Sequence, residues 1–454
     1  MNLSRIPWYI IATLTLSASN FLTTLLLVNI MSAEEFARWA LIEPLMHIGA
    51  SVATIGTQYG MIRFIASGSH DRRTTYRAVL FVLISVSAIL FVLSTPFYVA
   101  YFGIYTAILL FSSQVTESLA STSSAALRAL RRGRAFALFE GGRSVILLLV
   151  LSAAGLFQLS SAYSASDFLL NRAIVMSLFC VISLLFIFHS TPAYNSTVIP
   201  LVSYGLPIFL GQLAIQFALN ADRYIFVLAG LPAESLTQYV VHSRVAGLIG
   251  IVVLSPLALS YPAKVANSDQ TGASDGLARA AEVAVLAASL PLVLCATFLV
   301  GTVWPLVFPG VVLDRFLIAA LSFGVVMQAL AVAWNVGALR PGHTRWNTLP
   351  PVLSLVVVVA LGYPLTAHFG VAGAAASKML ALCVYAFAFL LISLRITRQS
   401  DNKRHLLWFF LSAVIILAAA LPGSYFLPSG VFAALTTWCI GIYVNRLHIR
   451  NPLL

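Results

Sequence analysis

The sequence predicts an all-α polytopic membrane protein with about 14 transmembrane helices. Its 454 residues are 60% hydrophobic and only 9% charged, whereas soluble domains carry roughly 25% charged residues. Apolar runs of roughly 18 residues or more recur along the whole chain, and each is long enough to cross a bilayer as a helix that satisfies its own backbone hydrogen bonds. A water-soluble protein is therefore excluded, and the net charge of +12 does not indicate a nucleic-acid partner.

Each predicted helix corresponds to one of these apolar runs. Glycine and proline within a run do not exclude a membrane helix, because neighbouring helices satisfy the backbone groups that they free. The predicted spans are 8–30, 39–61, 78–100, 104–126, 136–158, 168–189, 200–229, 236–262, 281–303, 316–338, 348–367, 371–393, 406–422 and 429–446.

The basic residues support this set of spans, because Lys and Arg collect in the cytoplasmic loops of membrane proteins. With a cytoplasmic N-terminus, 19 of the 26 basic residues fall in or beside alternate loops, and the outer loops hold only Arg38 and Arg315. The 19 are Arg5, Arg63, Arg72, Arg73, Arg77, Arg128, Arg131, Arg132, Arg134, Lys264, Arg279, Arg340, Arg345, Arg395, Arg398, Lys403, Arg404, Arg446 and Arg450. Both termini are thus expected in the cytoplasm.

A weak internal repeat with an offset of 200 residues predicts the domain organisation. Residues 31–39 (MSAEEFARW) resemble residues 231–239 (LPAESLTQY), and both segments fall in the outer loop after the first helix of a candidate six-helix unit. Chance similarity in a biased composition is the alternative. Duplication predicts a six-helix lobe at 1–199, a second at 200–395, and two appended helices at 396–454.

Five short motifs are spread over nearly the whole chain, and their order and spacing are more specific than any one of them. They are Ser32-Ala-Glu-Glu-Phe36 with Trp39, Tyr204-Gly-Leu-Pro207, Asn220-Ala-Asp-Arg223, Gln238-Tyr239 with Arg244, and Gly370-Val-Ala-Gly-Ala374. With these motifs the chain resembles the oligosaccharide flippases of the multidrug/oligosaccharidyl-lipid/polysaccharide exporter superfamily, which include O-antigen and exopolysaccharide repeat-unit translocases.

The resemblance implies two pseudo-symmetric lobes around a central cavity that opens alternately to each side of the membrane. It also implies a polyprenyl-pyrophosphate-linked oligosaccharide as cargo, a bacterial inner (plasma) membrane, and polysaccharide polymerases as candidate partners besides the membrane lipids. The first span lacks the Arg-Asp cluster of the related peptidoglycan-precursor flippases, which makes that precursor a less favoured cargo.

Four basic residues inside the predicted spans are candidates for binding the pyrophosphate. A charged side chain at the centre of a bilayer costs roughly 2.5–3.5 kcal/mol on insertion scales, so those that persist usually face a cavity or one another. Guanidinium groups bind phosphates through charge-assisted and often bidentate hydrogen bonds. The alternative is that these side chains extend to the lipid headgroups. The candidates are Arg172, Arg223, Arg244 and Lys378.

Three acidic residues inside the spans are candidates for coupling transport to H⁺ or Na⁺. Glu43 and Glu117 are placed in the second and fourth spans, and Asp222 precedes Arg223. Because adjacent residues of a helix point about 100° apart, Asp222 and Arg223 are not expected to pair, although either is a candidate for pairing across helices. A structural ion pair with a basic residue such as Arg143 is the alternative for Glu43 and Glu117.

No motif for an enzyme or a cofactor is present. The sequence lacks a Walker A motif, His-Glu-x-x-His and a nucleophile elbow, and its four cysteines have no zinc-site spacing. We therefore expect no catalytic residue, metal or cofactor. A multidrug or cation antiporter of the same superfamily is the main alternative, for which a more acidic cavity is expected. A membrane polysaccharide polymerase or ligase is less favoured, because the longest predicted outer loop has only about a dozen residues.

Overall fold

The computed structural model describes residues 6–66, 72–130, 132–157, 163–188, 198–254, 344–397 and, except for 283, 286, 287 and 290, residues 281–335. Within these ranges the regular elements are all helices, as the sequence predicts. The chain divides into two compact units, Met1–Arg223 and Tyr224–Leu454. The predicted spans 406–422 and 429–446 lie outside the described residues.

The first unit contains seven complete helices and most of an eighth within its described residues. Their positions agree with the first seven predicted spans, except that the second span is divided between two helices. They are α1 (Ile6–Ile30), α2 (Ala33–Thr54), α3 (Thr57–Ala66), α4 (Arg72–Phe102), α5 (Ile104–Ala129), α6 (Gly133–Phe157), α7 (Ala165–Phe188) and α8 (Val198–Leu228), of which α8 crosses the boundary between the units.

The division of the second span corrects the prediction of one continuous helix over 39–61. Ile55 and Gly56 both have positive φ, at 41° and 69°, and they end α2 before α3 begins. At this turn Gly56 approaches Gly205 of α8 so closely that a Cβ on Gly205 would overlap the Gly56 carbonyl group. The break thus depends on a backbone contact with a residue that is distant in sequence, and local hydropathy does not report such a contact.

This contact makes Gly205 a test of the packing in the first unit. Replacing Gly205 with alanine is expected to destabilise the protein by about 1–3 kcal/mol, because the backbones at Gly56 and Gly205 must separate to admit the methyl group. Gly247 of α9 (Ala233–Val252) is a matched control, since a Cβ there has nothing within 4 Å. Thermal unfolding of detergent-solubilised protein should show a lower Tm for Gly205→Ala and no loss for Gly247→Ala. Equal Tm values for wild type and Gly205→Ala would contradict the close contact.

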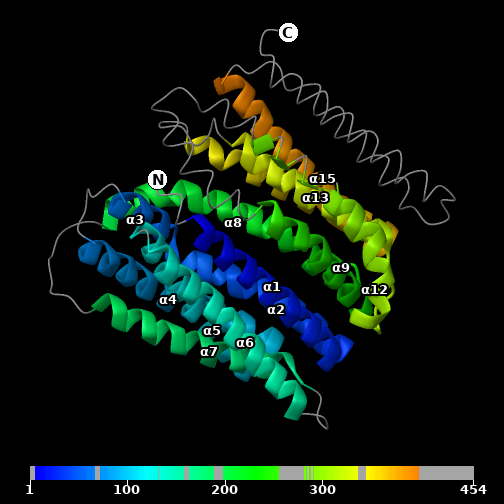
Figure 1. The fold of residues 1–454 in the computed structure, drawn as a ribbon, viewed down its shortest axis with the longest axis horizontal. Helices are drawn as coiled ribbons and strands as arrows, with labels where there is room; N and C mark the ends of the chain where they lie inside the picture. Colours follow the sequence, from blue (N-terminus) through cyan, green and yellow to red (C-terminus); the bar gives the residue numbers. More distant parts are fainter. Residues whose placement is uncertain are drawn as a thin grey trace. The chain divides into compact units, whose positions relative to one another are not determined.

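The central helix of the first unit is α5, which packs against α2, α3, α4, α6 and α7. Figure 1 shows α4, α5, α6 and α7 running alongside one another. The buried positions of α5 are mainly alanine, serine and threonine, and such small residues let helix backbones approach closely inside a membrane. Several hydroxyls donate to backbone carbonyls one turn earlier, as Thr122 does to Ser118 at 2.9 Å. The polar residues of α5 therefore face the protein interior.

Large apolar side chains are exposed on the surface of the first unit, whereas polar side chains of α5 are buried, which is the pattern of a protein surrounded by lipid. On α4 the exposed side chains include Val92 at 69% and Leu93 at 71%, whereas Ser118 and Thr122 of α5 have no exposed surface. Six helices in the described residues are long and apolar enough to cross a membrane: Ile11–Ile30, Thr74–Phe102, Gly133–Gly155, Val198–Leu228, Arg315–Trp334 and Leu349–Arg395. The buried hydroxyls of α5 explain why a hydropathy criterion leaves that helix out.

The described part of the second unit contains two long helices besides α9, one of which is bent. Its described elements after α9 are η2 (Cys295–Leu299), α12 (Val300–Val307), α13 (Arg315–Trp334), η3 (Thr344–Asn347) and α15 (Leu349–Thr397). The chain bends within α15 at Gly370, where φ is 57° and ψ is −134°. This glycine falls between the predicted spans 348–367 and 371–393, which are therefore two separate helical segments. α13 packs against both α9 and α15.

Corresponding helices of the two units begin 200 residues apart, at Ala33 and at Ala233. Phe36 and Leu236, the matched apolar residues of the first turns, are 1% and 3% exposed. Ser32 caps α2 by accepting a hydrogen bond from the Glu35 N–H at 3.2 Å, whereas Pro232 precedes α9. The two helices thus agree in position and burial, while the division into lobes at 1–199 and 200–395 with two helices at 396–454 stays a prediction.

Candidate functional site

In the described part of the first unit, ion pairs between largely buried side chains form two groups, and each group contains one predicted acidic and one predicted basic site residue. One group joins α5, α6 and α7 through Glu117, Glu140, Arg143 and Arg172. The other joins α2 to α8 through Glu43 and Arg223. Both groups belong to helices of the first unit, so their geometry is defined within one compact body.

Glu117 is the central residue of the first group because its two carboxylate oxygens bind different helices. Its Oε2 lies 2.8 Å from Arg172 Nη2 on α7, and its Oε1 lies 3.3 Å from Arg143 Nη1 on α6. Arg143 also binds Glu140 on its own helix, with distances to Oε2 of 2.8 Å from Nε and 2.7 Å from Nη2. The other Glu140 oxygen accepts a hydrogen bond from Ser124 of α5. Two carboxylates therefore balance two guanidinium groups.

The two arginines of this group differ in how completely they are bound. Arg143 has two carboxylate partners, and its Nη1 also lies 3.7 Å from the Met176 sulfur. Arg172 has Glu117 as its carboxylate partner among the described residues, and its buried Nε has no hydrogen-bond acceptor there. Arg172 is only 9% exposed, so this donor is also shielded from bulk solvent. An unsatisfied buried donor is costly, which makes Arg172 the member of the group with spare capacity for an anion.

The second group places Arg223 against α2. Its Nη1 donates to Glu43 Oε2 at 2.9 Å and to the Ala40 carbonyl oxygen at 2.8 Å. Asp222 is 1% exposed and accepts the backbone N–H of Arg223 at 2.9 Å. The Arg223 guanidinium group thus pairs across helices, with Glu43 of α2.

Two predicted site residues belong to the second unit. Lys378 of α15 lies with its Nζ 5.7 Å from the centroid of the Tyr239 ring on α9, a distance at which a cation–π attraction operates. Arg244 lies on the same helix as Tyr239 and is partly buried. His242 of α9 is fully buried and accepts the Asp314 backbone N–H at 2.8 Å through Nε2, a contact that fixes its ring tautomer and ties α9 to the start of α13.

The structure therefore pairs predicted anion-binding residues with predicted ion-coupling residues, Arg172 with Glu117 and Arg223 with Glu43. It also contains the Arg143–Glu117 pair that the alternative interpretation of Glu117 named. Sequence reasoning missed Glu140, although its spacing of three residues from Arg143 is typical of an ion pair on one helix face. Among the described residues no group of three His, Cys, Asp or Glu side chains is arranged to hold a metal ion.

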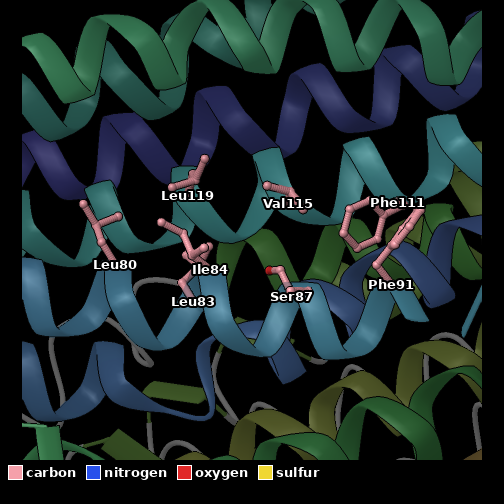
Figure 2. A pocket seen from close by; sticks show the side chains of 9 residues that line it. Leu80, Leu83, Ile84, Ser87, Phe91, Phe111, Val115 and Leu119 are labelled. Atoms are coloured by element: carbon pink, nitrogen blue, oxygen red, sulfur yellow. The ribbon is translucent and has the colours of Figure 1, made fainter. Parts of the chain in front are cut away.

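An apolar groove of about 520 Å³ lies between α4 and α5 (Figure 2). The Phe91 and Phe111 rings meet at one end of it with a centroid distance of 4.7 Å. It is lined by Leu80, Leu83, Ile84, Ser87, Ala88, Phe91, Phe111, Val115 and Leu119. Val115 is two residues from Glu117, so the groove and the charged group occupy different faces of α5. The groove suits hydrocarbon, whereas the charged group suits ions.

Comparison with solved structures places this fold among those of known transporters. The lipid II flippase MurJ, in an inward closed conformation, matches with a TM-score of 0.68 at 14% identity over 97% of this chain and 99% of that chain. MATE in complex with MaL6 matches with a TM-score of 0.67 at 14% identity over 87% and 95%. A MOP superfamily transporter from Pyrococcus furiosus matches with a TM-score of 0.66 at 13% identity over 87% and 96%. No family model and no curated protein matches the sequence.

The described helices thus have a fold like that of these three proteins. The chain is a multi-pass membrane protein whose all-helical architecture is shared with MATE and with MurJ.

Proposed function

We propose that the protein is a flippase that moves a polyprenyl-pyrophosphate-linked oligosaccharide from the cytoplasmic to the outer leaflet by alternating access, for the synthesis of O-antigen or exopolysaccharide. The observation that carries this proposal is the buried guanidinium group of Arg172, which has a donor without an acceptor among the described residues. A phosphate oxygen satisfies such a donor and supplies the charge that a guanidinium group prefers. Arg223, Arg244 and Lys378 are the other proposed binding residues.

The structural likeness fits both a lipid flippase and a multidrug transporter, since the lipid II flippase MurJ and MATE in complex with MaL6 match with TM-scores of 0.68 and 0.67. The apolar groove on α4 and α5 supports a lipid-linked cargo, because it gives the first unit a surface that suits hydrocarbon.

A multidrug or cation antiporter is the second candidate, and one observation favours it. The sequence suggested a mainly basic set of charges inside the membrane, but Arg143, Arg172 and Arg223 are each paired with a carboxylate in the first unit. A balanced set of charges also suits the exchange of a cationic drug for protons or Na⁺. The identity of the cargo therefore separates the two candidates.

Reconstitution in proteoliposomes tests the two candidates side by side. One arm measures how fast a fluorescent polyprenyl-pyrophosphate-linked disaccharide moves between leaflets, by quenching with membrane-impermeant dithionite. The other arm measures ethidium transport under a pH or Na⁺ gradient. The proposal predicts movement of the lipid probe, a loss of about tenfold in Arg172→Ala, and no loss in Arg315→Ala, which changes a basic residue at the start of α13. Ethidium transport without movement of the lipid probe would overturn the proposal in favour of the antiporter.

We further propose that the protein resides in a bacterial inner membrane with both termini in the cytoplasm, beside the polymerase that would use its product. The distribution of 19 of 26 basic residues supports this orientation. A reporter that is active only in the periplasm should be active when fused after Ala162 or Pro232 and silent after Arg132 or Lys403. Reporter activity after both Arg132 and Lys403 would show that the proposed orientation is wrong.

A further inference from the structure

Glu117 forms ion pairs with Arg143 and Arg172, and losing the Glu117 carboxylate would affect these two arginines differently. Without Glu117, Arg143 keeps Glu140 at 2.7 Å. Arg172 would keep no carboxylate within the described part of the chain, and its Nε already lacks an acceptor. The pair that joins α5 to α7 is therefore the one that an incoming anion can replace without disturbing the pair on α6.

Charge balance determines what must accompany that replacement. Glu117, Glu140, Arg143 and Arg172 sum to zero net charge, and their side chains are between 8% and 13% exposed. Among the described residues, His47 of α2 and Cys180 of α7 are the other titratable groups that interact with Glu117. An anion that binds Arg172 leaves the Glu117 carboxylate with Arg143 alone, which Glu140 already neutralises. The group then carries excess negative charge in a region of low dielectric, where an uncompensated charge is expensive. Uptake of one monovalent cation by Glu117 removes this cost.

We propose that the diphosphate of the cargo and the Glu117 carboxylate compete for Arg172, and that the displaced Glu117 takes up one proton or one Na⁺. This inference rests on the proposed function and deepens it, because it gives one physical site to the cargo and to the coupling ion. No covalent bond other than an O–H bond changes: in the proton case the Glu117 carboxylate becomes a carboxylic acid, and in the sodium case it becomes a ligand of Na⁺.

The exchange also connects binding to a change in conformation. Arg172 and Glu117 are largely buried, so an anion reaches Arg172 only when α5 and α7 separate on that side. The Glu117–Arg172 pair resists this separation, as do the hydrogen bond between Thr106 and Ser166 at 2.9 Å and that from Cys180 to the Thr116 carbonyl at 3.3 Å. Binding of cargo and loss of the α5–α7 ion pair are therefore linked, and the linkage is reciprocal.

The test uses the purified full-length protein in detergent, with inorganic pyrophosphate as the probe and titration calorimetry in two buffers of different ionisation enthalpy. Protons taken up on binding are counted for wild type and for Glu117→Gln. The difference between the two proteins cancels the ionisation of pyrophosphate itself. Glutamine removes the competing charge, so we expect about tenfold tighter binding in Glu117→Gln. If the ion is a proton, wild type takes up about one proton more per pyrophosphate.

A parallel series at rising NaCl, with choline chloride as the matched salt, identifies the ion. If Na⁺ is used, the proton difference is zero, and Na⁺ strengthens pyrophosphate binding by wild type but not by Glu117→Gln. Glu117→Asp is the control, because it keeps a carboxylate at this position and should retain the ion uptake of wild type. In Glu140→Gln, Arg143 is available to neutralise the displaced Glu117, so the same charge balance predicts loss of the ion uptake. Glu140→Gln therefore serves as the second test if Glu117→Gln does not fold.

Failure of the exchange is distinguishable from failure of the proposed function. If wild type moves the lipid-linked probe but does not bind pyrophosphate, the exchange is overturned and the flippase assignment stands. The same conclusion follows if Glu117→Gln neither tightens binding nor alters proton or Na⁺ dependence. If wild type neither moves the lipid probe nor binds pyrophosphate, both the function and the exchange are wrong.

Discussion

Replacing Arg143 with leucine is expected to destabilise the protein by about 3–5 kcal/mol, because it leaves two buried carboxylates without their shared partner. Glu140 would lose contacts of 2.7 and 2.8 Å, and Glu117 would lose its contact with α6 while keeping Arg172. Arg143 is 7% exposed, so water cannot replace the lost contacts without opening the helix packing. The expected result is a large decrease in Tm and in the amount of folded protein extracted from membranes.

A second substitution, which removes the charge of the unpaired Glu140 carboxylate, is expected to restore stability. Arg143→Leu combined with Glu140→Gln should recover most of the lost stability, since Glu117 and Arg172 remain as a neutral pair and the new amide oxygen can still accept a hydrogen bond from Ser124. Replacement of a complete buried ion pair is often close to neutral, whereas removal of one partner is not. If Arg143→Leu alone were as stable as wild type, the group of Glu117, Glu140, Arg143 and Arg172 would not contribute to the stability of the first unit.

Much of the helical framework was predictable because membrane insertion imposes a strong constraint on composition. The predicted bounds 104–126 compare with Ile104–Ala129 for α5, and 200–229 compares with Val198–Leu228 for α8. Gly370 appeared in the sequence as the junction of two spans, and in the structure it is where the helix direction changes. These elements depend on local hydropathy and on single residues with special conformations, and a sequence displays both directly.

The break at Ile55 and Gly56 was not predictable in the same way. The residues on either side of it, among them Thr54 and Thr57, are compatible with a continuous helix, and nothing local marks the contact with Gly205. Gly56 and Gly205 are 149 positions apart, and the role of either glycine can be recognised only once their contact is known. Long-range backbone contacts of this kind are the part of the fold that hydropathy does not encode.

The charged site was predictable as a set of residues but not as a set of pairs. The cost of a charge in a bilayer identifies Glu117, Arg172 and Arg223 as residues with a function or a partner. Hydropathy does not say which helices touch, so the sharing of Glu117 between Arg143 and Arg172 comes from the structure alone. Glu140 was not predicted, because it lies near the edge of the predicted span 136–158, where a charge costs little free energy of insertion.

Exchanging the residues of the other ion pair is expected to separate a structural role of Arg223 from a role in transport. Arg223→Glu alone places a second carboxylate beside Glu43, and Glu43→Arg alone places two guanidinium groups together. Each is expected to lower stability by about 3 kcal/mol or more, since the side chains of the pair are only 11% and 15% exposed. The double variant Glu43→Arg/Arg223→Glu restores opposite charges on α2 and α8 and should recover most of the Tm.

Transport in the double variant is expected to remain at least about tenfold below wild type, because the proposed anion-binding charge has moved from α8 to α2 and the donor to the Ala40 carbonyl is lost. Arg223→Lys provides the comparison, since it keeps the positive charge on α8 and should retain partial transport as well as stability. Both quantities come from one preparation: Tm in detergent, and movement of the lipid-linked probe after reconstitution. If the exchanged pair recovered stability and transport together, Arg223 would act only as a structural partner of Glu43, and the proposed binding residues would reduce to Arg172, Arg244 and Lys378.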